Sequence, residues 1–313
     1  MKNKIIPLVL FCVFLFLGVF AIVMFNRYKA FRILSIYQEY NVVSTQENPV
    51  VNVPLYLEKK NSFMSKKENV KSAYIENGSY SFVTHLDSIK VGDTIEYGGT
   101  KFYEYYYTLS FSSYDDFVNE IFMENGQMRL DFANGDSMSF AIGNISLYLN
   151  KKTDNSGIVL RDLEAVTNFV AGKETIVGLN ITIGNYNDGV INLKSVKVNN
   201  KFYELDYMSY KREEVPSKTI LTEIYDNYDY TSTSISDGYM NINVAPNNTL
   251  TLFIPLKYLN GVRYVSSLPL FISYTLDSED LVKVVDSFTF ISKNAFSMRN
   301  GLKEYEYKYN WPF

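Results

Sequence analysis

The residue types that most often carry catalysis are scarce in this 313-residue chain. His85 is its only histidine and Cys12 its only cysteine, and neither a Gly-x-Ser-x-Gly nor a His-Glu-x-x-His string occurs. A histidine-based triad or a zinc site needs partners that these residues lack. We therefore expect no catalytic residue and no cofactor. A pair of carboxylates facing each other across a cleft, as in glycosidases, leaves an envelope hydrolase open as an alternative.

Hard cations are the only metal ions for which the chain offers suitable ligands. Residues 154–155, 185–188 and 226–229 are Asp- and Asn-rich and have the turn character of loops that bind calcium. None matches the twelve-residue calcium loop, and such turns are common without a metal. The sequence therefore predicts no metal site.

Clustered tyrosines are the more informative feature. Alternation along a strand places every second side chain on one face of the sheet. Rigid amphipathic rings are favoured at surfaces that recognise a protein or the face of a sugar. The alternative is that the rings pack between sheets with their hydroxyls toward water. The candidate recognition surface consists of Tyr103, Tyr105, Tyr106, Tyr107, Tyr305, Tyr307 and Tyr309.

The chain begins with an apolar segment that could attach the rest of the protein to a membrane. Ile5–Phe25 contains 21 residues without a charge, and a helix of that length covers the roughly 30 Å of membrane hydrocarbon. Because residues 23–27 offer no small-residue cleavage site, residues 1–26 are predicted to be an uncleaved signal-anchor helix. Lys2 and Lys4 precede it, which favours a cytoplasmic N-terminus and extracytoplasmic C-terminal domains.

The segment after the anchor is polar and contains prolines, so residues 27–53 are interpreted as a juxtamembrane stalk and linker. Residues 54–152 then show alternating and clustered β-forming residues, typical of an antiparallel β domain. Asn134-Gly135 predicts a tight hairpin turn within it. One short helix is also expected, capped by Ser113 and ending at Asn125-Gly126.

The second half of the exported part carries the clearest strand pattern. Within residues 175–183, Val177, Leu179, Ile181 and Ile183 share one face, opposite Gly, Asn and Thr. Further strands are expected near residues 191–198, 202–205, 219–225, 239–244, 249–256, 269–276 and 285–292. Strands at this spacing are typical of a β-sandwich, and residues 153–313 are assigned to it, beginning after a polar turn segment.

Two stretches of this domain resemble a known family. They are KETIVGLNITIGNYNDGVINLKSVKVNNKFYELDY (173–207) and VAPNNTLTLFIPL (244–256). Over about residues 165–290 the chain is similar to the immunoglobulin-like extracellular domains of bacterial lipoproteins and secreted antigens, the immunoprotective-antigen-like group. The resemblance implies an Ig-like β-sandwich outside the cytoplasm. It supplies no site residues.

Composition and charge limit the class of partner. The net charge is −4 without a basic block, so nucleic acid is excluded as a partner. The fold class predicted is mainly β, with an N-terminal transmembrane helix followed by two antiparallel β domains. The expected function is membrane-anchored binding or adhesion, or a structural role, at a bacterial envelope, with a protein or glycan partner. A subunit of a secretion- or conjugation-type envelope assembly is the other alternative.

Overall fold

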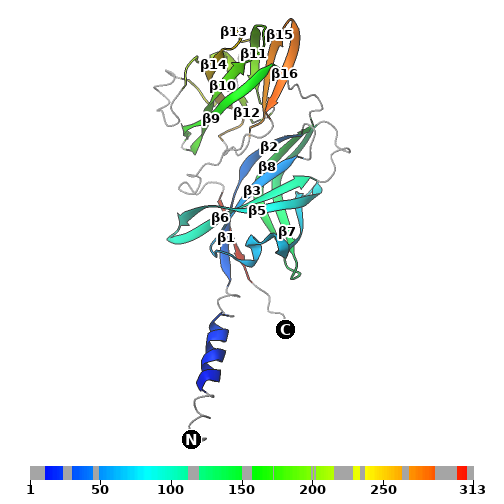
Figure 1. The fold of residues 1–313 in the computed structure, drawn as a ribbon. Helices are drawn as coiled ribbons and strands as arrows, with labels where there is room; N and C mark the ends of the chain where they lie inside the picture. The colour runs from blue at the N-terminus through cyan, green and yellow to red at the C-terminus, as the bar shows by residue number, and fades with distance from the viewer. Residues whose placement is uncertain are drawn as a thin grey trace.

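The computed structural model shows a chain made mostly of β-strands, with one large sheet and a two-sheet sandwich (Figure 1). The predicted mainly β fold is confirmed. Among the described residues, three short 3₁₀-helices lie between the strands, at Phe63–Ser65, Lys67–Asn69 and Tyr207–Ser209. The structure describes residues 11–23, 30–44, 49–111, 120–149, 157–171, 173–198, 200, 202–214, 228–232, 237–262, 268–285 and 302–308.

Residues 11–23 form an α-helix within the apolar N-terminal segment. Its side chains are exposed all around the helix, and Phe14 and Phe16 have relative exposures of 71% and 70%. In the part of the chain that the structure describes, no helix is both long and apolar enough to cross a membrane. The predicted span, Ile5–Phe25, continues at both ends into residues outside the described ones.

The first sheet has nine strands in the order β17-β1-β3-β6-β5-β4-β7-β8-β2. Most neighbours are antiparallel, and β2 and β8 are parallel. The strands are β1 (Phe31–Ile36), β2 (Gln38–Ser44), β3 (Val50–Leu57), β4 (Val70–Glu76), β5 (Ser81–Tyr97), β6 (Thr100–Phe111), β7 (Glu120–Phe132), β8 (Ser137–Leu149) and β17 (Leu302–Tyr307).

A bend at Tyr37 joins the two ends of this sheet. β1 pairs with β3 and β17, whereas β2, its direct continuation, pairs with β8. Gly143 of β8 lies against the Gln38 backbone at the start of β2; its φ is +126°, and a Cβ there would lie 1.8 Å from the Gln38 carbonyl oxygen. The sheet therefore curls around one apolar core to which all nine strands contribute.

The described part of the predicted stalk and linker, residues 27–53, is instead the beginning of this sheet. β1, β2 and β3 carry fully buried side chains such as Ile33 and Val53. The prolines misled the prediction. Pro54 pairs with Tyr106 of β6, but the pairing of β3 with β1 covers only residues 55–57. A proline without an N–H is tolerated in a strand at such a position.

The predicted helix ending at Asn125-Gly126 is wrong in its described part. Residues 112–119 lie outside the described ones, and residues 120–126 belong to β7, where Ile121 pairs with Leu147. A register shift between Met123 and Gly126 forms a bulge, and Asn125 has a φ of +53°. The Asn-Gly signal marks this bulge rather than a helix end.

The hairpin predicted at Asn134-Gly135 is confirmed. β7 and β8 pair up to Asp131 and Ser137 on either side of the turn. Gly135 adopts a φ of +90°, and the Asn134 amide donates to the Asp136 carboxylate at 2.7 Å. The turn is closed by the Phe132 N–H, which donates to the carbonyl of Asp136.

The second unit is a β-sandwich, as predicted. Two four-stranded sheets, in the orders β12-β14-β10-β9 and β13-β11-β15-β16, share one apolar core. Leu179, Ile181 and Ile183 are fully buried, as their alternation indicates. The strands are β9 (Ile158–Val170), β10 (Lys173–Asn185), β11 (Ile191–Lys197), β12 (Tyr203–Leu205), β13 (Ile242–Val244), β14 (Thr249–Tyr258), β15 (Leu270–Leu276) and β16 (Glu279–Val285).

Other details of the sandwich differ from the sequence prediction. The strands expected near residues 219–225 and 285–292 lie outside the described residues, apart from residue 285, which ends β16. The last strand, β17, leaves the sandwich and pairs with β1 in the first sheet. The prediction that residues 153–313 form the second domain is therefore wrong for β17. The strands of the sandwich lie within residues 158–285, and residues 302–307 complete the first sheet.

Side chains at one end of the first sheet contact the sandwich. The Asn41 amide of β2 donates to the Tyr203 hydroxyl, and its carbonyl oxygen accepts from the Asn200 amide at 2.6 Å. The rings of Phe122 and Phe202 pack with centroids 5.4 Å apart. These contacts join β2 and β7 to β12 and to the loop before it.

Candidate functional site

The tyrosines predicted to form a recognition surface mostly pack inside the first sheet. Tyr103, Tyr105 and Tyr107 share the core-facing side of β6, and the last two are fully buried. The Tyr107 hydroxyl donates to the Met64 carbonyl at 2.9 Å, and that of Tyr105 accepts from the Asn61 N–H at 3.1 Å. Tyr105 and Tyr107 therefore belong to the core, and Tyr103 is partly buried against it.

Tyr305 and Tyr307 of the set also form hydrogen bonds within the first sheet. The Tyr305 hydroxyl accepts from the Ala141 N–H at 2.8 Å, and the buried Tyr307 donates to Asp136 at 2.6 Å. Tyr106 lies on the opposite side of β6 and hydrogen-bonds to Glu104. Tyr309 lies outside the described residues. The packing alternative therefore holds for Tyr105, Tyr107 and Tyr307, the buried members of the set.

Buried tyrosines make the fold sensitive to high pH. Burial raises the pKa of Tyr230 to about 12 and raises the pKa of Tyr40, Tyr107 and Tyr258 further. In the unfolded chain a tyrosine ionises near pH 10. Each of these groups therefore contributes stability that is fully present below about pH 10 and is lost as the pH rises toward the folded-state pKa.

We accordingly expect the free energy of unfolding, measured with urea, to fall steeply between about pH 10 and pH 12. Tyrosinate absorbance should rise in two stages, with the second coinciding with loss of the β-sheet circular dichroism signal. Complete tyrosine ionisation near pH 10 with the circular dichroism unchanged would contradict this expectation.

In the segments considered for calcium, the Asn185 and Asp229 side chains form hydrogen bonds within the protein. Asn185 is fully buried, and its amide donates to the carbonyls of Gly189 and Val244 at 2.9 and 2.8 Å. Asp229 accepts from the N–H and hydroxyl of Thr231. Residues 154–155 lie outside the described ones. Within the described residues, no three His, Cys, Asp or Glu side chains gather as a metal site.

A polar pocket of about 460 Å³ lies where β4 ends and β7 bulges. This volume falls in the range of small-molecule sites, roughly 300–1,000 Å³. Glu76 and Gln127 are register partners across β4 and β7, which places them at the same level of the sheet. The lining residues are Glu76, Asn77, Gly78, Glu124, Asn125 and Gln127.

The turn between β4 and β5 forms one wall of this pocket and is fixed by Asn77. The Asn77 side-chain oxygen accepts from the N–H groups of Ser79 and Tyr80 at 2.9 and 2.8 Å. Its amide donates across the pocket to the Glu124 carbonyl at 3.1 Å. This bond ties the turn to the β7 bulge.

The β7 bulge forms the opposite wall and is fixed by Asn144 of β8. The Asn144 side-chain oxygen accepts from the Asn125 N–H at 3.0 Å and from the Tyr37 hydroxyl at 2.6 Å. The same Tyr37 hydroxyl lies 3.1 Å from the Asn125 side-chain oxygen. Both walls are therefore held by hydrogen bonds within the protein.

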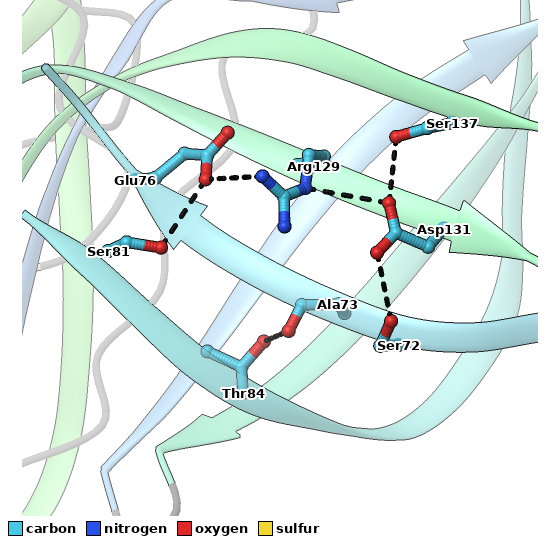
Figure 2. Close-up of polar contacts among 8 residues, drawn as sticks. All are labelled: Ser72, Ala73, Glu76, Ser81, Thr84, Arg129, Asp131 and Ser137. Atoms are coloured by element: carbon cyan, nitrogen blue, oxygen red, sulfur yellow. Dashed lines mark hydrogen bonds and ion pairs between the residues drawn. The ribbon is translucent and has the colours of Figure 1, made fainter.

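An ion-pair network on the outer face of the sheet positions Glu76 (Figure 2). Arg129 donates to Glu76 Oε2 at 3.1 Å and lies 3.5 Å from Asp131 on its other side. Its guanidinium stacks 4.1 Å from the centroid of Tyr74. Ser72 and Ser137 donate to Asp131. Glu76, Arg129 and Asp131 are therefore each held by a hydrogen bond or an ion pair.

Sequence reasoning missed this pocket, although the chain carries a signal for it. The tripeptide Glu-Asn-Gly occurs at residues 76–78 and again at 124–126. The antiparallel pairing of β4 with β7 brings the two copies together, and five of the six lining residues belong to them. A repeated turn tripeptide was thus the available clue.

Comparisons with known proteins add little. No family model and no curated protein matches the chain. Two of the similar solved structures are described as the BspA C-terminal domain, and the second is titled as that of the Streptococcus agalactiae AgI/II polypeptide. Their sequence identities to this chain are 11% and 12%. Both matches cover 81% of this chain and 99% of the other, with TM-scores of 0.19. The C-terminal domain of the Streptococcus pyogenes antigen I/II-family protein AspA is 10% identical, with coverage of 82% and 99% and a TM-score of 0.20. Scores of this size carry no inference about function.

Proposed function

We propose that this chain is a non-catalytic binding or structural protein of a bacterial envelope, held in the membrane by its N-terminal segment. The observation that supports this most is the insertion of the sandwich between β8 and β17 of the first sheet. β17 returns to pair with β1, the strand that follows the apolar segment. The sandwich lies on the side of the first sheet away from the N-terminal helix (Figure 1), an arrangement suited to display.

The helix at residues 11–23 supports the membrane attachment. Apolar side chains cover its whole circumference, including Phe11, Phe14 and Ile22, each more than half exposed. A helix that is apolar all around is unfavourable in water and is stabilised by protein or by lipid hydrocarbon. The 21 uncharged residues from Ile5 to Phe25 provide the length for lipid.

A charge in the middle of this segment should release the protein from the membrane. We expect Leu15→Arg to move the full-length chain from the membrane pellet to the soluble or aggregated fraction after alkaline carbonate washing. Replacing leucine by arginine at a helix centre changes the insertion free energy by about 3–4 kcal/mol. Leu15→Ile is the matched control and should remain in the pellet. Retention of the arginine variant would show that the segment is not the anchor.

Topology is tested separately with a C-terminal tag and protease added to intact bacterial cells expressing the full chain. Loss of the tag before lysis is the expected result for domains exposed at the surface. Loss only after an outer barrier is opened would place the domains in the periplasm, still outside the cytoplasm. Protection until complete lysis would place them in the cytoplasm and overturn the proposal.

A further inference from the structure

The hydrogen-bonding groups of the polar pocket include both donors and acceptors. The Gln127 side chain is exposed and forms no hydrogen bond with any described residue, so its carbonyl and its amide are both available to a ligand. Arg129 and Ser81 engage only Oε2 of Glu76, which leaves Oε1 as an acceptor. The Asn125 side-chain oxygen lies 3.1 Å from the Tyr37 hydroxyl, whose proton goes to Asn144 at 2.6 Å, and the Asn125 amide is a further donor.

Such a mixture matches hydroxyl groups, because each hydroxyl donates one hydrogen bond and accepts others. A bare cation is a poorer match, since it needs oxygen ligands alone. An apolar ligand is a poorer match as well, because it would bury the Gln127 and Glu76 polar atoms without partners.

The two walls of the pocket and Glu76 are held in place by hydrogen bonds within the protein. Asn77 joins the two walls, Asn144 fixes the bulge and Arg129 fixes Glu76. A site built in this way loses little conformational entropy on binding.

Charge narrows the ligand class further. Two of the lining residues are glutamates, and none of the described lining residues is basic. Arg129, the nearest cation of the network, is shared between Glu76 and Asp131. A carboxylate or sulfate on the ligand would therefore meet the like charge of the two glutamates.

We propose that the pocket between the two Glu-Asn-Gly segments, at residues 76–78 and 124–126, binds a neutral saccharide. This inference rests on the proposed function, because a protein displayed at an envelope meets glycans. Gln127 bonds the sugar hydroxyls directly, whereas Glu124 disfavours anionic sugars.

The test uses the full-length chain in a zwitterionic detergent, since a sugar-headed detergent would compete. Isothermal titration calorimetry with maltotetraose, chitotetraose and tetragalacturonate compares two neutral probes with one anionic probe of equal length. We expect at least one neutral probe to bind and tetragalacturonate to bind at least tenfold more weakly. Gln127→Ala should weaken neutral binding by about tenfold, the effect of losing one or two hydrogen bonds.

Two further variants make the test specific. Asn192→Ala removes an amide on the sandwich that bonds to Asn243 and should leave binding unchanged. Glu124→Gln should reduce the discrimination against tetragalacturonate. Absence of binding by both neutral probes, equal losses in Gln127→Ala and Asn192→Ala, or equal affinity for the anionic probe would overturn the inference. Surface exposure without saccharide binding would remove only the pocket assignment, and binding by a cytoplasmic chain would remove only the envelope assignment.

Discussion

Gly143→Ala is expected to prevent the first sheet from closing. The new Cβ would lie 1.8 Å from the Gln38 carbonyl oxygen and 2.5 Å from its nitrogen. Both atoms are backbone, so no side-chain rotation relieves the clash. The φ of +126° adds strain for any residue with a Cβ. We expect a loss of about 4 kcal/mol or more in the free energy of unfolding, a size that few single substitutions reach.

Gly135→Ala is the matched control for this substitution. Gly135 also has a positive φ, +90°, but a Cβ there meets no atom within 4 Å. Its cost should be limited to backbone strain, about 1–2 kcal/mol. Urea unfolding of the full-length variants, followed by circular dichroism, compares the two. Similar losses for both variants would show that the contact with Gln38 does not limit the fold.

Lys257→Met is expected to destabilise the sandwich by about 3–5 kcal/mol, because it removes one member of a buried ion pair. Lys257 Nζ lies 3.4 Å from Asp206 Oδ2, and the Asp206 side chain is only 3% exposed. Tyr228 and Ser209 donate to the same oxygen, whereas Oδ1 is buried with no hydrogen bond from a described residue. Without the ammonium group, Asp206 remains as a poorly compensated buried charge.

The double variant Asp206→Asn/Lys257→Met should recover part of this loss, since neither buried charge remains. Lys194→Met is the surface control. Lys194 lies 2.6 Å from Asp280, whose side chain is 78% exposed, and exposed pairs contribute about 1 kcal/mol or less. Equal destabilisation by Lys257→Met and Lys194→Met would contradict a special role for the buried pair.

The sandwich was the part of the fold that the sequence predicted best. Alternation in β10 follows from local geometry, because Leu179, Ile181 and Ile183 must share one face of any strand. The strands before β4 were missed for a different reason. Their partners β17 and β8 lie far away in the chain, and no local pattern records such pairing. Two prolines then outweighed the apolar residues of β1 and β3.

The candidate site depended on the same non-local information. Alternation places Tyr103, Tyr105 and Tyr107 on one face, but Tyr106, which the prediction grouped with them, lies on the other, and sequence alone did not decide which face was the core. The pocket required the pairing of Glu76 with Gln127, two strands that are separated by β5 and β6 along the chain. A residue pattern reveals such a site only when both halves carry the same local signature, as the two Glu-Asn-Gly segments do.

The antiparallel pairing of β1 with β17 also determines how the molecule resists a pulling force. With the N-terminal segment held, tension enters β1 at Phe31, whereas a load on the sandwich enters β17 at Leu302. These residues lie at opposite ends of the ladder, since Phe31 pairs with Tyr307 and Leu302 with Ile36. The two strands are thus loaded in shear, so all six pairs must break together rather than one after another.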